Sequence, residues 1–277
     1  MKALKFMLVL ATVTMVAVSC GPKKPKSLVL YYSQTSNTKA VAQEIAKRMN
    51  ADLEEIVVVN PYDGDFEATV DRCLQERKNG IIPEIKPIKA NLQKYETIFI
   101  GYPVWFGTYA PPIASLLDQI DLSGKTVVPF CTFGSGGLSS SVQDLVRKLP
   151  NSRIPTGFGI RAARLAAMPN EVDQFLKENQ FIEGDFVRLE DFNEMKPVTE
   201  TEEAIFNAAV GDYPMIHAKA EYFCSRAILG GTEYLFVAVD LPREDAPDMP
   251  PAGQMKVYVN VMDGQAPEFT QVVRQRQ

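Results

Sequence analysis

The stretch Ser33-Gln34-Thr35-Ser36-Asn37-Thr38 decides the fold, because a predicted strand precedes it and a predicted helix follows it. The strand is the apolar run 28–32, and the helix carries apolar residues at positions 41, 42, 45, 46 and 49. A helix start presents unpaired backbone N–H groups, so a polar stretch at this place predicts a phosphate site. It contains no Lys or Arg, and an anion would be held by neutral donors and the helix dipole. The alternative is that Ser36 or Asn37 only caps the helix.

Strands and helices alternate as far as residue 180. Further strands are expected at 53–59, 95–101, 126–131 and 154–160, and helices at about 70–75, 113–120, 138–149 and 170–178. The prolines and the glycine of residues 102–112 predict a segment without regular structure. This alternation specifies an α/β fold in which a doubly wound, five-stranded parallel sheet has helices on both faces.

Two further loops have unusual composition. Residues 102–110 hold Trp105, the only tryptophan, and three other aromatic residues, which could stack against a flat ring. The alternative is a loop folded over a sheet edge. Residues 132–138 contain three glycines, which allow the backbone to approach a ligand closely. Loops that follow parallel strands share one edge of the sheet, so these two loops and residues 33–38 are expected to form one site.

With these three loops, residues 27–182 resemble a flavodoxin-type domain. The motifs are Ser33-x-Thr35-x-x-Thr38, Gly101-Tyr102-Pro103-x-Trp105 with Pro111-Pro112, and Thr132-Phe133-Gly134-x-Gly136-Gly137. The resemblance implies FMN as the cofactor, with the ring between Trp105 or Tyr109 and the third loop, and no catalytic side chain or metal. The expected FMN-binding residues are Ser33, Gln34, Thr35, Ser36, Asn37, Thr38, Pro103, Val104, Trp105, Phe106, Gly107, Tyr109, Thr132, Phe133, Gly134, Gly136 and Gly137. Ser36 departs from the family, which usually has glycine there.

Other chemistries find little support in the sequence. Gly134-x-Gly136 lacks the third glycine of a dinucleotide fingerprint, and no Walker-type loop occurs. The only histidine, His217, lies outside this domain, which argues against a Ser-His or Cys-His device. The cysteines after residue 20 form no Cys-x-x-Cys pair, and Cys73 and Cys131 are expected to be buried free thiols.

The N-terminus has the pattern of a targeting segment. Lys2 and Lys5 precede an apolar run, residues 6–18, that is too short to span a bilayer and leads to Ser19-Cys20-Gly21. Residues 1–20 resemble a bacterial lipoprotein signal peptide, in which Cys20 would carry the lipid. The alternative is an ordinary cleaved secretory signal. Residues 21–26 would form a basic tether, and the protein would lie in the bacterial cell envelope on the periplasmic side.

The charge distribution indicates a second domain. The net charge of −5 argues against nucleic acid as a partner. Residues 1–184 carry 21 basic and 18 acidic side chains, whereas residues 185–277 carry 8 and 16. This step supports a linker at 183–200 and a separate domain at 201–277.

A small α+β antiparallel domain is predicted for residues 201–277. A helix is expected at about 201–209, a hairpin at 227–239 around Gly230-Gly231, and a strand at 255–261. Residues 227–237 resemble the central hairpin of cystatin-like domains, which in those inhibitors enters a papain-type protease, but the usual Gln at its start is missing.

Three functions remain open at this point. The leading one is a lipid-anchored, FMN-binding electron-transfer protein or oxidoreductase, whose partner is a redox protein or a small-molecule electron acceptor. The second is a cofactor-free scaffold whose C-terminal domain binds a protein or envelope partner. The third is protease inhibition through Leu229-Gly230-Gly231. The sequence does not specify NAD(P)H, a quinone or another donor.

Overall fold

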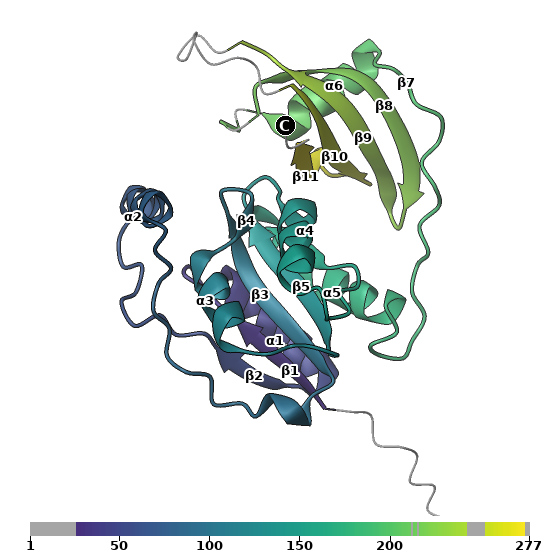
Figure 1. The fold of residues 1–277 in the computed structure, drawn as a ribbon. Coiled ribbons are helices and arrows are strands. Elements are labelled where there is room, and N and C mark those ends of the chain that lie inside the picture. Colours follow the sequence, from purple (N-terminus) through teal and green to yellow (C-terminus); the bar gives the residue numbers. More distant parts are fainter. Residues whose placement is uncertain (1–25, 212, 215, 243–252, 275–277) are drawn as a thin grey trace, which may run out of the picture.

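The computed structural model describes residues 26–242, apart from 212 and 215, and residues 253–274 (Figure 1). The predicted signal peptide with Cys20, and all of the predicted tether except its last residue, lie outside the described residues. Within them, no helix is long and apolar enough to cross a membrane. The chain forms a helix-flanked sheet followed by a second, antiparallel sheet, and a long segment runs between them (Figure 1).

The first domain is the predicted doubly wound parallel sheet. Its parallel strands run in the order β2-β1-β3-β5-β6. The strands are β1 (Ser27–Tyr31), β2 (Asp52–Glu55), β3 (Thr97–Trp105), β5 (Thr126–Phe133) and β6 (Phe158–Arg161). The helices are α1 (Asn37–Met49), α2 (Phe66–Asn79), α3 (Pro111–Gln119), α4 (Leu138–Lys148) and α5 (Met168–Glu178), with single 3-10 turns at Leu92–Lys94 and Ala162–Arg164.

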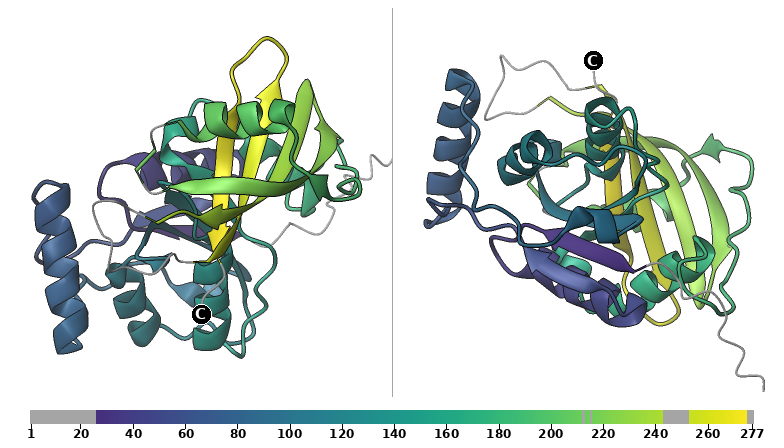
Figure 2. Two further views of the ribbon diagram at one scale, coloured as in Figure 1. Left: turned by 90° about the horizontal axis from the view of Figure 1, so that it is seen from above. Right: turned by 60° about the horizontal axis from the view of Figure 1, so that its bottom comes forward.

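The core lies on both faces of this sheet. Along β1, Leu28 and Leu30 belong to the cluster under α3 and α4, whereas Val29 and Tyr31 belong to the cluster under α1 and α5. A strand that is buried on both faces must be apolar at consecutive positions, which explains the unbroken apolar run. Helix α2 stands away from the other helices of this domain (Figures 1 and 2).

The prediction that residues 102–112 lack regular structure is wrong. Strand β3 continues to Trp105, and the short strand β4 (Thr108–Tyr109) folds back on it. The turn residues Phe106 and Gly107 have φ values of 51° and 75°, as a two-residue hairpin turn requires. The prolines at 111 and 112 open α3, where a missing N–H costs nothing. We call residues 102–109 the aromatic hairpin.

Several element boundaries also differ from the sequence prediction. The second and fifth strands are shorter than expected, since β2 ends at Glu55 and β6 begins at Phe158. Both are edge strands of the parallel ladder. Beyond β2, Val58 makes only an isolated bridge to Ile85, and Pro155 has no N–H to contribute before β6. Helix α2 is longer than predicted and spans 14 residues.

The second domain is the expected α+β layer. It contains β7 (Lys196–Pro197), α6 (Glu200–Val210), β8 (Ala218–Ile228), β9 (Gly231–Asp240), β10 (Gln254–Met262) and β11 (Glu268–Arg274). The strands form an antiparallel meander in the order β11-β10-β9-β8-β7. Phe206 of α6 packs against Phe236 of β9, with ring centroids 5.3 Å apart. The hairpin turn lies at Leu229 and Gly230, because Gly231 already begins β9. Strand β11 was not predicted from the sequence.

Candidate functional site

Residues 33–38 form a tight loop at the start of α1. Ser36 occupies the N-cap position with a left-handed backbone, φ 65°, and its side chain makes no cap hydrogen bond. Asn37 is the first helical residue, and the Ser33 Oγ accepts a hydrogen bond from the Lys39 N–H at 3.2 Å. Among the described residues, none accepts a hydrogen bond from the backbone N–H groups of residues 34–38. The loop therefore presents the row of free donors that an anion site needs.

Two side chains of this loop are already engaged. The Thr38 hydroxyl lies 2.8 Å from the Thr132 hydroxyl, and both side chains are buried, so this pair ties the loop to the end of β5. Gln34 turns the other way, and its Nε2 donates to the Tyr62 carbonyl at 3.0 Å and to the Thr69 hydroxyl at 2.8 Å. Thr35 is exposed and, with Ser36, offers its hydroxyl to the surface.

The aromatic hairpin meets the glycine-rich loop, residues 132–138. A Cβ on Gly137 would lie 2.5 Å from Val104 Cγ1, so only a glycine allows the hairpin to approach this closely. The Ser140 hydroxyl of α4 donates to the Gly107 carbonyl at 2.5 Å. Pro103 lies beside Thr132 in the β3–β5 register. The glycine-rich loop thus contacts both of the other loops that were expected to share this edge of the sheet.

Three aromatic side chains of the hairpin, Trp105, Phe106 and Tyr109, lie beside α2 and α3, whereas the Tyr102 hydroxyl donates to Ser141 of α4. Trp105 contacts Tyr32 and Tyr62 edge-on, with ring centroids 5.9 and 5.1 Å apart. An apolar cavity of about 300 Å³ is lined by Trp105, Phe106 and Tyr109, together with residues of α2 and α3 that include Cys73. The glycine-rich loop contributes no residue to this cavity. The residues predicted to lie on either side of a ring therefore border two different spaces in the structure.

Burial raises the pKa of two tyrosines and one thiol near this cavity. It raises the pKa of Tyr32 and of Tyr62 above the ordinary tyrosine value, and it raises the pKa of the Cys73 thiol to about 11. Cys73, Cys131 and Cys224 are free and buried, as expected for the first two. At neutral pH these groups carry protons, so they are poor nucleophiles and bases.

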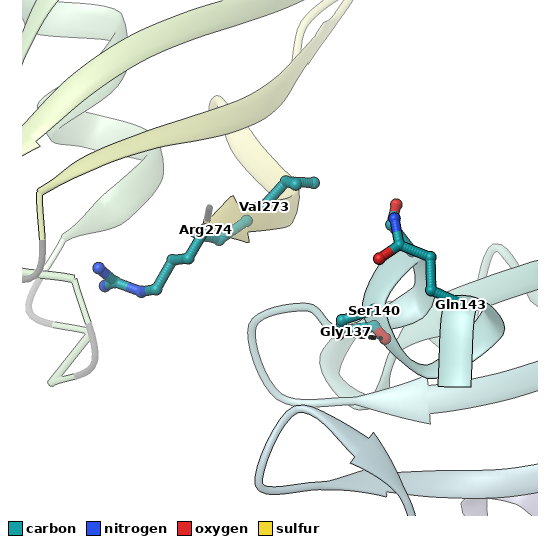
Figure 3. A pocket seen from close by; sticks show the side chains of 7 residues that line it. Gly137, Ser140, Gln143, Val273 and Arg274 are labelled. Carbon is teal, nitrogen blue, oxygen red and sulfur yellow. Dashed lines mark hydrogen bonds between the residues drawn. The ribbon is translucent and has the colours of Figure 1, made fainter. Parts of the chain in front are cut away.

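The glycine-rich loop is covered by the second domain. The Val272 N–H of β11 donates to the Ser135 carbonyl at 2.6 Å, and Gly136 pairs with Val272 as an isolated parallel bridge. A Cβ on Gly136 would overlap the Val272 carbonyl oxygen. Phe133 points into the core of the first domain. Beside this contact, a cavity of about 400 Å³ separates Gln143 and Ser140 from Val273 (Figure 3).

Arg161, the last residue of β6, was not among the site residues predicted from the sequence. Its side chain is 7% exposed, and its Nε donates to the Gly134 carbonyl at 2.8 Å. Its Nη1 donates to the Phe269 carbonyl at 2.8 Å, with the guanidinium 3.4 Å from the centre of the Phe269 ring. Burial lowers the pKa of this guanidinium, and the nearby Glu268 opposes that shift. The sequence does contain a signal for this residue: a charged arginine stands at the end of a predicted buried strand, at the edge of the sheet where the loops meet.

Ser36 allows a direct test of the phosphate-loop geometry. A left-handed backbone disfavours β-branched residues most strongly. We expect Ser36→Val to lower the free energy of unfolding by about 2 kcal/mol, with Ser36→Gly at least as stable as the unaltered chain. Urea denaturation of the FMN-free protein measures both changes. A Ser36→Val variant as stable as the unaltered chain would contradict this geometry.

Comparison with known proteins agrees with this architecture. A family model described as Flavodoxin matches residues 26–167, just over half of the 277 residues. A flavoprotein from Lactobacillus acidophilus NCFM, solved in complex with FMN, is 28% identical over 53% of this chain and 99% of its own, with a TM-score of 0.45. A candidate flavoprotein from Bacteroides uniformis ATCC 8492 is 26% identical over 55% of this chain and 99% of its own, with a TM-score of 0.49. No curated protein matches the chain.

The matched residues contain the three loops, the parallel sheet and Arg161. The second domain lies beyond the match. On the strength of the family model, this chain belongs to the flavodoxin family, and FMN is the cofactor of its first domain.

Proposed function

We propose that this protein is an FMN-dependent electron-transfer protein or oxidoreductase, held at the bacterial cell envelope by a lipid on Cys20. The observation that carries the flavin part is the row of free N–H groups at residues 34–38, which stands at the start of the 13-residue helix α1. The Thr38–Thr132 hydroxyl pair fixes this row against the glycine-rich loop.

The loop of residues 33–38 fits the phosphate of FMN. The phosphate would be held by the backbone donors of residues 34–38 and by the hydroxyls of Thr35 and Ser36, and no carboxylate in the loop would repel it. The groups expected beside the ring belong to the aromatic hairpin and the glycine-rich loop, which border different cavities in the structure. Bound FMN supplies a ring that takes up and releases hydride or single electrons. The chain's own task is to bind and orient this ring, and the protonated Tyr and Cys side chains nearby add no charge to the site.

The envelope location rests on the sequence. Two lysines, a short apolar run and Ser19-Cys20-Gly21 form the pattern of a lipoprotein signal, and the basic residues that follow suit an anionic membrane surface on the periplasmic side. The electron partner, a redox protein or a small-molecule acceptor, is part of the same proposal. Membrane fractionation of cells that make the chain, compared with Cys20→Ser, tests the anchor: recovery of both proteins in the soluble fraction would refute it.

An FMN titration tests the flavin part. The protein as purified, or after reconstitution with FMN, should show flavin absorbance bands. Thr35→Val should raise the dissociation constant at least ten-fold, since a hydrogen bond to a charged group is worth about 1.5–3 kcal/mol. Thr201→Val, an exposed position on α6, is the matched control. Anaerobic addition of NADH or NADPH to the holoprotein then shows whether a nicotinamide donor reduces it.

The opposite result has a clear meaning. An unaltered, folded chain that binds no FMN after reconstitution would overturn the proposal, and it would favour the cofactor-free scaffold.

A further inference from the structure

We propose that the second domain is part of the flavin site, and that Arg161 is a positioning residue that fixes the glycine-rich loop between the two domains. This inference rests on the proposed FMN binding and adds a role for residues beyond the flavodoxin match. It predicts that the reduction potential of bound FMN depends on how β11 is docked.

Apart from Arg161, the described residues of the first domain hold the glycine-rich loop at its two ends. At one end, the Thr132 hydroxyl is paired with that of Thr38. At the other, Gly137 lies against Val104, and α4 begins. These contacts leave the three middle residues of the loop, 134–136, to be fixed by other partners.

Those partners connect the loop to the second domain. Arg161 donates to the Gly134 carbonyl and, with a different nitrogen, to the Phe269 carbonyl of β11, both at 2.8 Å. The guanidinium thus spans the two domains with one planar group, a geometry that lysine cannot reproduce in full. The next contact is the Val272 N–H, which donates to the Ser135 carbonyl at 2.6 Å.

The attachment on the β11 side is rigid. Phe269 is buried in the core of the second domain and packs on Tyr213, with ring centroids 5.2 Å apart. A Cβ added at Gly134 would lie 2.8 Å from the Tyr213 hydroxyl, so this side chain also covers the loop. Because packed cores resist small deformations, the middle of the loop follows the position of β11.

This arrangement has a consequence for the cofactor. Hydrogen bonds and charge near a flavin ring set how readily it accepts electrons. The glycine-rich loop is the ring-side loop of the site, and its middle carbonyls at 134 and 135 are turned to Arg161 and Val272. Release of these carbonyls would change what the loop presents to the ring, so docking of the second domain tunes the flavin.

The test compares full-length variants at this contact. Arg161→Gln is expected to raise the FMN dissociation constant at least ten-fold and to shift the reduction potential measured by anaerobic redox titration. In FMN-free Arg161→Gln, the Val272 amide should exchange its hydrogen at least ten-fold faster than in the FMN-free unaltered chain. Arg161→Lys keeps the charge and one donor group. It should therefore change the dissociation constant, the reduction potential and the Val272 exchange rate less than Arg161→Gln does. Gly136→Ala, which pushes against the Val272 carbonyl, should shift the potential without touching Arg161.

Arg164→Gln is the matched control. Arg164 also bridges the domains, through Glu268 at 3.1 Å, but its hydrogen bonds and ion pairs within the described part of the chain go to Glu268 and Glu171 and not to the glycine-rich loop. It should leave the reduction potential unchanged. Circular dichroism checks that each variant is folded. If Arg161→Gln does not fold, the reduction potential and Val272 exchange rate of Gly136→Ala test the proposal.

The two proposals fail in different ways. Failure of the unaltered chain to bind FMN overturns the proposed function. An unchanged Val272 exchange rate in Arg161→Gln and Gly136→Ala overturns the positioning role, whether or not FMN binds. A potential that stays constant in both variants while FMN remains bound overturns the tuning by the second domain.

Discussion

Replacing Gly101 with alanine is expected to lower the free energy of unfolding of the first domain by about 3 kcal/mol, the upper end of the usual cost of overpacking. Gly101 lies in β3 directly beside Phe130 of β5. A Cβ at this position would overlap the Phe130 ring, whose side chain is fully buried. The ring cannot turn away, because interiors of this kind are close-packed on all sides.

A second substitution can relieve this overlap. Phe130→Leu removes the ring atoms that the new methyl group would meet, so Gly101→Ala combined with Phe130→Leu should cost less than the sum of the two single changes. Urea denaturation followed by the fluorescence of Trp105 measures all three variants, since the only tryptophan lies in this domain. Additive losses would show that the glycine is not required by the ring.

Replacing Phe206 with alanine should lower the free energy of unfolding of the second domain by about 3–5 kcal/mol, the usual cost of removing a buried aromatic side chain. Phe206 is 1% exposed and packs from α6 onto the sheet, against Phe236. The cores of the two domains are separate clusters, so this loss should fall on the second domain.

The signature of this change is two unfolding transitions. Circular dichroism should detect an early transition in Phe206→Ala, while Trp105 fluorescence should report a later one. Phe66→Ala is the matched control, because Phe66 is 86% exposed and its removal leaves no cavity. Coincident transitions in Phe206→Ala would mean that the domains unfold as one unit.

The sequence was sufficient for the parallel sheet and for the meeting of its loops. Alternating strands and helices specify the doubly wound order, and the carboxyl ends of parallel strands then bring residues 33–38 and 132–138 to one edge. The departure at Ser36 was also visible in the sequence. In the structure it coincides with a left-handed backbone, the conformation for which glycine is best suited.

The aromatic hairpin could not be predicted from composition. Its turn places Phe106, a non-glycine residue, at positive φ, and Pro111 and Pro112, which follow it, lie in the first turn of α3, where a missing N–H does little harm. Gln34 shows a similar limit. A glutamine in a polar loop suggests a ligand contact, but its amide is used by Tyr62 and Thr69, and that choice depends on where α2 lies.

The contact between the domains was beyond the reach of sequence reasoning for a different reason. Arg161 precedes Phe269 and Val272 by more than 100 residues, and the three form no motif. Each has a local explanation, as a strand end or as an apolar strand position. Their common role depends on β11, a strand of seven residues that follows from pairing with β10.

The docking of β11 also protects the molecule against self-association. A meander has two open edges, and an exposed edge strand can pair with another chain. At one edge, β7 has only two residues, one of which is Pro197, which has no N–H to donate. At the other, the glycine-rich loop binds the Val272 N–H. A chain whose domains separate would therefore expose a free strand, so the same contact that joins the domains keeps the second sheet from acting as a template for aggregation.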